Sequence, residues 1–416
     1  MKKLLTVTLF TGLLTLLRMA MGFVIAKVVA IYTGPTGMAM LGQVQSMVAI
    51  LNGMINAPAG AGVVRFTAQH QEQGFDACTP WWRASVRWIV ILLAILIPLG
   101  LVLAKPLSHW LFASGDYAWL IIITVLALPF TAMGTLITSV TNGLQQYRRY
   151  IGLGMVSTVI SSLVMIALII KQNLMGALLA AALQAGLIGV VMLIASLRQP
   201  WFKLRYWWGQ SASEERKAIG GYILMAVTSA LTIPVSLVMV RNILVSHVGW
   251  EQAGQWQAVW KISEVYLGVI TMALGTYYLP KLASLSGVDA ILKEINSTAR
   301  IIIPIVAIMA LAVYFLRDIA ISLLFTEAFR SARDLFAIQL MGDVIKIASW
   351  LYAYPMLARG ATKWFMVTEV FFSGMFVMFS YFLVGQFGTQ GANSAYLLNY
   401  ILYFLFLFFN VRKISR

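Results

Sequence analysis

Basic residues inside long apolar runs are the most chemically informative feature of this sequence. Arg18 and Lys27 interrupt the run that starts at Leu4. Arg241 and Lys261 interrupt two further runs in the second half of the chain. A charge at the bilayer centre costs about 2.5 to 3.5 kcal/mol on insertion scales, so these side chains should face a protein interior or a wet cavity. Because the deep charges are mainly basic, we predict that these four residues line a site for an anionic substrate.

The depth of each basic residue affects how it can act. Arg18 lies about 21 Å along the first run, beyond the midplane of a hydrocarbon core about 30 Å thick. It could face a cavity, or it could pair with a helix-end carbonyl or a carboxylate. Lys27 lies about half a turn from Arg18 on a straight helix, so it shares the cavity only if the helix bends near Gly22; otherwise it can reach the outer surface. Arg241 follows Pro234, which should kink its helix, and is a candidate counterpart of Lys27 in the second half.

Polar side chains at helical spacing form one stripe on each of two apolar runs. Amides suit sugar hydroxyls because they both donate and accept hydrogen bonds. The two stripes are therefore predicted to be walls of a substrate site. Membrane helices also use such groups to bond to one another, and this alternative stays open. The stripes consist of Gln45, Asn52 and Asn56 in the first half and of Gln257, Lys261 and Glu264 in the second.

Two carboxylates in apolar runs lie three residues from a lysine. Lys261 precedes Glu264, and Asp343 precedes Lys346. Each couple is predicted to be a local ion pair that lowers the cost of insertion. The alternative is that Glu264 or Asp343 is a proton-coupling site, because a carboxylate in a low-dielectric cavity holds a proton more readily.

Membrane helices must position these residues. The chain is 61% hydrophobic and only 11% charged, with a mean hydropathy of +0.86, whereas a soluble domain is about a quarter charged. The apolar runs are continuous and about as long as a spanning helix, and they lack the alternation of a β-barrel. The sequence predicts an all-α, multi-pass protein with twelve transmembrane helices and short connections, the longest inner one being 59–83. The predicted spans are 4–31, 36–58, 84–104, 118–141, 151–170, 174–196, 217–243, 253–279, 301–323, 334–357, 363–384 and 391–410.

The distribution of Lys and Arg predicts the orientation. With both termini cytoplasmic, the inner segments carry most of the 30 basic residues, as expected for membrane proteins. The net charge of +16 is therefore assigned to membrane topology, with no nucleic-acid partner. Cys78 is the single cysteine, and His70, His109 and His247 are scattered among loops, so no disulfide, metal or cofactor is predicted.

A motif that occurs twice indicates an internal repeat. Gly37-x-x-x-x-Gly42-Gln43-x-Gln45 returns 212 residues later as Gly249-x-x-x-x-Gly254-Gln255-x-Gln257. Each half holds six predicted helices, an even number, so the two bundles run parallel and the binding site is expected between them. The predicted organisation is an N-terminal six-helix bundle at 1–197, a basic and aromatic cytoplasmic interfacial linker at 198–216, and a C-terminal six-helix bundle at 217–416.

Along its whole length the chain resembles the polysaccharide-transport flippases of the multidrug/oligosaccharidyl-lipid/polysaccharide exporter superfamily. The resemblance is carried by the twelve helices, the two glycine-glutamine turns, and the Asn142-Gly143-Leu-Gln-Gln-x-Arg148 ending of the fourth helix. It implies a V-shaped pair of bundles around a central cationic cavity. By position, Arg18 and Lys27 match the first-helix basic residues of such cavities.

The resemblance also implies a cargo and a location. The cargo is an undecaprenyl-diphosphate-linked oligosaccharide, expected to be the glycolipid of enterobacterial common antigen. Alternating access would carry it from the cytoplasmic to the periplasmic leaflet of the bacterial inner membrane. By position, Arg241 and Lys261 match the cavity cations of the second half. The implied partners are membrane lipids, a polymerase and a chain-length regulator, and the expected working form is a monomer.

Two other functions fit the composition less well. A cation-coupled multidrug exporter of the same superfamily would favour a cavity dominated by carboxylates, whereas the deep charges here are mainly basic. A membrane glycan polymerase would need a substantial outer active site, whereas the predicted outer loops are short. No Gly-x-x-x-x-Gly-Lys-Ser/Thr motif occurs, so the sequence gives no sign of a nucleotide-dependent enzyme.

Overall fold

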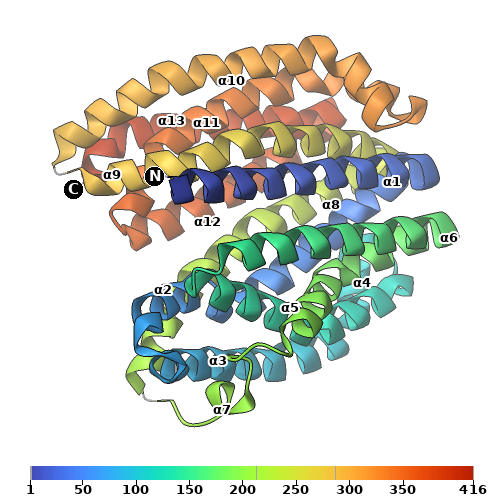
Figure 1. Ribbon diagram of the computed structural model, residues 1–416. Helices are drawn as coiled ribbons and strands as arrows, with labels where there is room; N and C mark the ends of the chain where they lie inside the picture. Colours follow the sequence, from blue (N-terminus) through green and yellow to red (C-terminus); the bar gives the residue numbers. More distant parts are fainter. Residues whose placement is uncertain (1, 212, 286, 416) are drawn as a thin grey trace. The chain divides into compact units, whose positions relative to one another are not determined.

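The computed structural model describes residues 2–211, 213–285 and 287–415, and for 2–11, 218, 221, 222, 225 and 276 it describes only the backbone. Within these ranges every regular element is a helix, which confirms the all-α prediction (Figure 1). In the same ranges nine helices are long and apolar enough to cross a membrane. The chain is therefore a multi-pass membrane protein.

Three of these helices contain one residue with non-helical backbone. These are Gly34 (φ 63°, ψ −166°) in α1 (Lys2–Asn56), Asn173 (φ 48°, ψ −123°) in α6 (Tyr147–Ser196) and Gly249 (φ 83°, ψ 170°) in α8 (Ser213–Ala273). Glycine reaches positive φ without steric cost, and asparagine tolerates it better than most residues. Each break falls between two of the predicted apolar runs. The break in α8 falls on Gly249, the first glycine of the repeated motif. The break in α1 falls on Gly34, three residues before the corresponding Gly37. The two break residues are therefore not related by the 212-residue offset.

The chain divides into two compact units. The first comprises Met1–Tyr32 and Gln43–Pro234, and the second comprises Thr33–Gly42 and Val235–Arg416. Helix α8 runs from one unit into the other, and the boundary follows Pro234, which lies inside the helix. A proline removes one backbone hydrogen bond, so the boundary coincides with a weak point in the helix.

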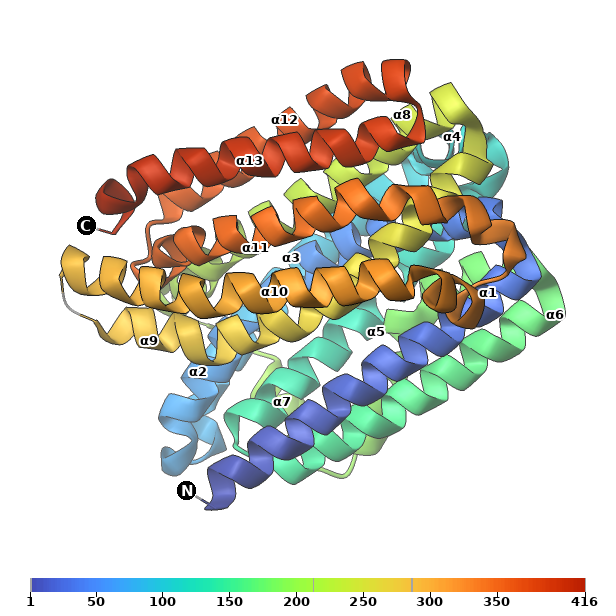
Figure 2. The ribbon, with the colours of Figure 1, turned by 90° about the horizontal axis from the view of Figure 1, so that it is seen from above.

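The first unit is built around α5 (Ala118–Gly143) and α6, which lie side by side in both views (Figures 1 and 2). A Cβ atom added to Gly134 of α5 would lie 2.6 Å from Cα of Gly189 in α6, and one added to Gly189 would lie 1.9 Å from the carbonyl oxygen of Phe130. Membrane helices associate through such small residues because the two backbones can then touch. The remaining elements are η1 (Ala57–Ala59), α2 (Ala61–His70), η2 (Gln71–Gln73), α3 (Phe75–Val102), α4 (Ala104–Phe112) and η3 (Gly115–Tyr117).

The linker after α6 contains one helical turn, α7 (Leu204–Trp207). Its aromatic side chains mostly point inward. Trp201 and Trp207 are buried, and the Trp207 ring stacks on Trp82 of α3 with the ring centroids 4.9 Å apart. Leu204 and Trp208 are instead 78% and 64% exposed. The linker is thus fastened to α3 by aromatic packing, and only part of its apolar surface faces outward.

The second unit continues α8 beyond Pro234 and packs α13 against α11 and α12 (Figures 1 and 2). Its buried core includes Tyr278, Leu351 and Leu407, and the Tyr278 hydroxyl donates a hydrogen bond to the Leu351 carbonyl at 2.9 Å. The elements after α8 are η4 (Leu274–Tyr278, a π-helical turn), α9 (Leu279–Ser284), α10 (Val288–Leu324), η5 (Glu327–Leu335), α11 (Phe336–Ala358), α12 (Thr362–Phe387) and α13 (Thr389–Ile414).

Candidate functional site

The first glutamine of each glycine-glutamine motif makes the same kind of hydrogen bond. Gln43 Nε2 donates to the carbonyl oxygen of Leu111 at 3.0 Å within the first unit. Gln255 Nε2 donates to the carbonyl oxygen of Ala328 at 2.7 Å within the second unit. In each case a buried amide joins a helix that follows a break to the segment between two later helices. The repeat read from the sequence is therefore present in the hydrogen bonding, where this glutamine has a structural role.

The second glycine of each motif allows a close approach within the second unit. A Cβ atom on Gly254 would lie 1.8 Å from the carbonyl oxygen of Pro35. A Cβ atom on Gly42 would lie 2.7 Å from Gln257 Cδ and 3.0 Å from Arg241 Nη1. Any larger residue at either position would have to displace backbone or a buried arginine. The two glycines thus let the turn after Gly34 pack directly on α8.

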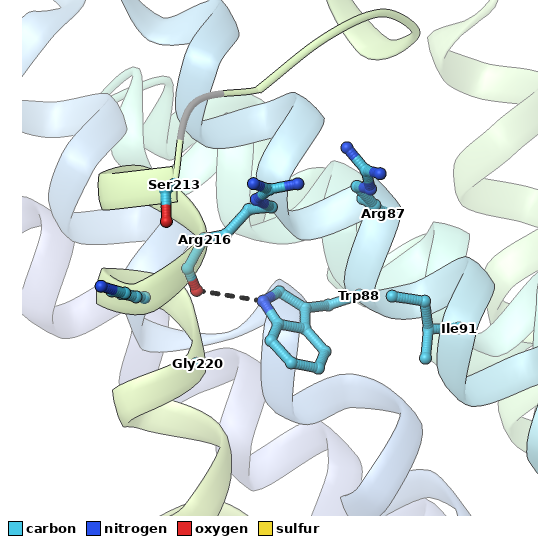
Figure 3. Close-up of a pocket in the computed structure, with 7 residues that line it drawn as sticks. Arg87, Trp88, Ile91, Ser213, Arg216 and Gly220 are labelled. Atoms are coloured by element: carbon cyan, nitrogen blue, oxygen red, sulfur yellow. Dashed lines mark hydrogen bonds between the residues drawn. The ribbon is translucent and has the colours of Figure 1, made fainter.

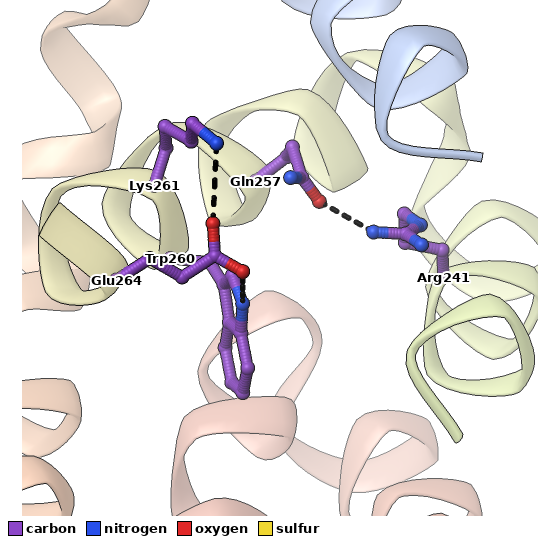
Figure 4. A network of polar contacts seen from close by, with 5 residues as sticks. All are labelled: Arg241, Gln257, Trp260, Lys261 and Glu264. Carbon is purple, nitrogen blue, oxygen red and sulfur yellow. Dashed lines mark hydrogen bonds and ion pairs between the residues drawn. The ribbon is translucent and has the colours of Figure 1, made fainter. Parts of the chain in front are cut away.

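Arg241 is the most deeply buried of the predicted cations. Its side chain is 1% exposed, and Nη1 donates to Gln257 Oε1 at 2.7 Å. Figure 4 shows this pair and, one turn further along α8, the partners of Glu264. A charged donor on an amide oxygen is a strong hydrogen bond, and it fixes the direction in which the guanidinium group points. The structure therefore brings together two of the predicted binding residues, with Gln257 positioning Arg241.

Lys261 and Glu264 form the predicted ion pair. Lys261 Nζ lies 3.3 Å from Glu264 Oε2, and Trp260 Nε1 donates to Glu264 Oε1 at 3.1 Å (Figure 4). The lysine and glutamate side chains are 30% and 46% exposed. Both groups therefore remain accessible to a ligand or to water, unlike Arg241. Gln257, Lys261 and Glu264 follow the break at Gly249, and Arg241, from the part of α8 before the break, reaches them through Gln257.

The predicted cations of the first unit lie on the first half of α1. Arg18 is exposed and runs beside α6, where its Nη2 would lie 3.6 Å from a Cβ atom added to Gly154. Lys27 is half-buried and has an interaction partner. An exposed guanidinium group at this position is free of the geometric restraint that Gln257 places on Arg241.

The polar stripe of the first unit lies on the second half of α1. Gln45, Asn52 and Asn56 are all half-buried, and the Asn56 Oδ1 atom is buried without a hydrogen-bond partner among the described residues. A Cβ atom on Gly53 would lie 2.1 Å from Cβ of Ala230, so this stretch of α1 packs tightly on the first part of α8. The stripe therefore lies next to a close helix contact. Its amides could bind a ligand or form hydrogen bonds between helices, and both interpretations stay open.

Asp343 was expected to pair with Lys346, and the structure gives it other partners. Its carboxylate is fully buried and accepts hydrogen bonds from the hydroxyls of Ser263, Tyr266 and Tyr396 at 2.6, 2.7 and 2.9 Å. The Gln339 amide adds a fourth at 3.3 Å. The predicted local ion pair is wrong because hydroxyls from α8 and α13 reach the carboxylate first. These partners could stabilise the ionised carboxylate without a cation.

Lys346 lies among aromatic rings. Its Nζ atom is 5.0 Å from the Trp350 ring centroid and 5.6 Å from that of Trp260. The Tyr396 and Tyr400 rings lie 5.7 and 5.6 Å away. An ammonium group at these distances is attracted by the ring faces, most strongly when it is desolvated. The aromatic side chains thus partly take the place that a carboxylate was predicted to fill.

Sequence reasoning missed the hydroxyl donors around Asp343. Ser263 and Tyr266 lie on the same helix as Lys261, three residues apart, and Tyr396 comes from α13. Only the spacing of Gln339 and Asp343, four residues apart on α11, signals a local contact. Among the described residues, no group of three His, Cys, Asp or Glu side chains could hold a metal ion.

Comparison with known proteins gives relatives that span the chain. No protein-family model matches it. The chain is 30% identical over 406 residues to the lipid III flippases of Escherichia coli (strain K12) and of Shigella flexneri, covering 95% of this chain and 95% of each relative.

Solved structures share the fold at low identity. A lipid II flippase MurJ in an inward closed conformation gives a TM-score of 0.73 at 14% identity, covering 99% of this chain and 90% of that one. An inward-facing multidrug resistance MATE transporter of the MOP superfamily gives a TM-score of 0.72 at 16% identity, covering 96% and 99%. These likenesses confirm the all-helical fold that the chain shares with these transporters, and the number of spans stays a prediction.

Proposed function

We propose, because the chain belongs to the lipid III flippase family, that it translocates a lipid-linked oligosaccharide across the bacterial inner membrane. The cargo is lipid III, the undecaprenyl-diphosphate-linked glycan of enterobacterial common antigen, moved from the cytoplasmic to the periplasmic leaflet. The observation that carries this proposal is the 30% identity over 95% of both chains. The protein acts as a transporter, and its substrate leaves chemically unchanged.

The proposed topology has twelve spans with both termini in the cytoplasm. Each of the three helices broken at Gly34, Asn173 and Gly249 counts as two spans, which adds three to the nine apolar helices of the described ranges. The distribution of Lys and Arg supports the cytoplasmic position of the ends. The proposed bundles are 1–197 and 217–416, joined by the linker at 198–216.

The proposed mechanism assigns the cations to the diphosphate and the amides to the glycan. Arg18, Lys27, Arg241 and Lys261 would replace the hydration of the phosphates, and Gln45, Asn52, Asn56 and Gln257 would exchange hydrogen bonds with the sugars. Alternating access through the central cavity that the sequence predicts would then expose the cargo to the other leaflet. Moving negative charge out of a negative cytoplasm is downhill by about 2.3 kcal/mol per charge per 100 mV, so the membrane potential alone can bias export.

Proton coupling is the second part of the proposal. Asp343 is the stronger candidate because it is fully buried and surrounded by hydroxyls that can accept as well as donate a hydrogen bond. Glu264 is exposed and already paired with Lys261, which makes it the weaker candidate. A monomer working beside a polymerase and a chain-length regulator completes the proposed arrangement. A multidrug exporter remains the alternative, supported by fold likeness alone.

The test uses cells that lack their own flippase and depend on this chain. Arg18→Ala and Arg18→Glu should abolish complementation, and Arg18→Lys should restore part of it, because a cation that meets phosphate can be exchanged for another cation. Lys105→Ala is the matched control, since it removes one exposed basic side chain elsewhere in the first unit. Expression of each variant is measured in the membrane fraction. Full complementation by all three Arg18 variants would assign Arg18 a structural role.

A direct assay then separates cargo from fold. The purified chain in proteoliposomes should translocate an undecaprenyl-diphosphate-linked glycan, and collapse of the membrane potential should slow the initial rate. Transport of cationic drugs in place of the glycolipid would favour the multidrug alternative. An initial rate that is unchanged without the potential would refute the proposed bias.

A further inference from the structure

A pocket of about 370 Å³ lies between the middle of α3 and the start of α8, within the first unit. Figure 3 shows its lining, which combines three basic side chains with one aromatic and one aliphatic side chain. The volume falls in the range of small-ligand sites. None of the predicted substrate-binding residues belongs to it. The lining residues are Arg87, Trp88, Ile91, Ser213, Arg216, Lys217 and Gly220.

The two helices that form the pocket are fixed to each other by Trp88. Its Nε1 atom donates to the carbonyl oxygen of Arg216 at 3.0 Å, and a Cβ atom on Gly220 would lie 3.5 Å from the same indole ring. In Figure 3 the guanidinium groups of Arg87 and Arg216 lie on one side of this hydrogen bond. The Trp88 hydrogen bond therefore fixes α3 and α8 so that Arg87 and Arg216 line the same pocket.

The three cations, Arg87, Arg216 and Lys217, form no ion pair with another described residue. Glu214 and Glu215 follow Ser213 directly and yet are not part of the lining. Three basic side chains around one cavity repel one another, so an anion would lower the energy of the arrangement. The first backbone N–H groups of α8 lack partners within the helix and add a favourable dipole.

The surroundings indicate that the anion carries acyl chains. Ile91 is 42% exposed at the pocket, and Leu224 is 62% exposed one turn beyond Gly220 on α8. Leu204 and Trp208 of the neighbouring linker are also largely exposed. Trp88 lies beside Arg87 near the start of the predicted apolar run 84–104, and a tryptophan beside basic residues at such a place is typical of the headgroup level of a membrane. A free anion would make no use of this apolar surface.

We propose that this pocket binds the phosphate headgroup of an anionic phospholipid from the surrounding leaflet. Arg87, Arg216 and Lys217 hold the phosphate, and the acyl chains run along Ile91 and the outer face of α8. Under the proposed topology this is the cytoplasmic leaflet, which attracts basic segments electrostatically. The binding proposal itself does not depend on the cargo. It adds a lipid that fastens the start of α8 to α3.

The experiment compares lipid binding by the native full-length chain and three variants in detergent. Native mass spectrometry and thermal unfolding are measured with phosphatidylglycerol, phosphatidylcholine, undecaprenyl diphosphate or inorganic phosphate added. R216Q/K217Q removes two of the pocket cations. R198Q/K203Q is the matched control, because it removes two exposed basic residues just before α8, outside the pocket. R216K keeps the charge and should keep binding.

Phosphatidylglycerol should bind the native chain and R198Q/K203Q alike, and should bind R216Q/K217Q about tenfold more weakly. Thermal unfolding without lipid should be similar in all forms, which separates lost binding from lost folding. Equal binding of phosphatidylglycerol by the native chain, R216Q/K217Q and R198Q/K203Q would overturn the proposal. Phosphatidylcholine binding as tightly as phosphatidylglycerol would also overturn it. Displacement of the lipid by inorganic phosphate would identify a free-anion site instead. Binding of undecaprenyl diphosphate with no binding of phosphatidylglycerol would make the pocket part of the transport route.

Discussion

Two helix pairs at corresponding places in the repeat differ in the side chains that join them. With the 212-residue offset, Thr131 and Gly134 of α5 fall on Asp343 and Lys346 of α11. In the first unit, Gly134 meets Gly189 and the backbones of α5 and α6 touch. In the second unit, α11 and α13 meet through the buried Asp343, its hydroxyl donors and the rings around Lys346. At this helix pair the repeat therefore preserves the framework and not the polar chemistry.

The difference indicates where the molecule tolerates costly groups. A glycine contact lets two membrane helices associate without placing any charge in the lipid. A buried aspartate and lysine must be compensated, and charges of this kind in membrane segments are usually tied to function. The first pair can thus be regarded as a rigid support. The second is the place where a proton or an ion could change the packing of the unit.

Removal of the Asp343 carboxylate should have the largest effect on stability of the changes considered for the two helix pairs. Asp343→Ala is expected to lower the free energy of unfolding by about 3 to 5 kcal/mol, because it leaves three hydroxyls and the Gln339 amide without their buried acceptor. Thr131→Ala, at the corresponding place in α5, should cost less than about 1.5 kcal/mol, since Thr131 only bonds the Ala127 carbonyl one turn back on its own helix. Denaturant unfolding in detergent measures both. Similar losses at the two positions would remove the contrast between the helix pairs.

Crowding the glycine contact should have the next largest effect. Gly189→Ala places a methyl group 1.9 Å from the Phe130 carbonyl oxygen, so α5 and α6 must separate. Overpacking of this kind costs about 1 to 3 kcal/mol. Gly152→Ala on the same helix meets no atom within 4 Å and should be neutral or slightly stabilising. A shift of the thermal midpoint that is equal for both variants would show that the close approach does not hold the pair together.

The two motif glutamines should give matched, smaller effects. Gln43→Leu and Gln255→Leu each leave one carbonyl oxygen, that of Leu111 or of Ala328, without its buried amide donor. Each change should cost about 1 to 2 kcal/mol. Equal losses in the same unfolding assay would establish that the motif has one structural role in both units. A loss confined to one half would mean that only one of these hydrogen bonds contributes to stability.

The long helices and the repeat could be predicted from the sequence because both depend on local or periodic signals. The breaks at Gly34, Asn173 and Gly249 fall between the predicted runs, since turn residues stand at those places. Helix α2 lies in the segment 59–83 that was read as a connection, because its short amphipathic pattern does not resemble a spanning helix. The predicted i,i+3 ion pair of Lys261 and Glu264 formed, as local spacing alone allows.

The hydrogen-bond donors around Asp343 could not be predicted from the sequence in the same way. Its donors come from α8, α11 and α13, and their meeting depends on how three helices pack. A local rule would pair Asp343 with Lys346, whereas the tertiary structure gives the carboxylate hydroxyl partners and gives the lysine aromatic ones. The pocket between α3 and α8 is a further case, because Arg87 and Arg216 are far apart in the chain and lie on helices that the Trp88 hydrogen bond joins.

The smallest effect on stability is expected at the ion pair of Lys261 and Glu264, and for this reason the binding role of Lys261 can be tested separately. Lys261–Glu264 and Arg330–Glu327 are both i,i+3 ion pairs, at 3.3 and 3.4 Å. Exposed pairs contribute little, so Lys261→Gln and Arg330→Gln should each change the free energy of unfolding by less than about 1 kcal/mol. If Lys261 binds the diphosphate, Lys261→Gln should nevertheless slow translocation in proteoliposomes at least tenfold, and Arg330→Gln should leave the rate unchanged. Because the two variants are matched in stability, any difference in rate must come from contact with the cargo or from movement of α8. Restoration of the rate by Lys261→Arg would favour contact, whereas equal rates for Lys261→Gln and Arg330→Gln would remove Lys261 from the proposed site.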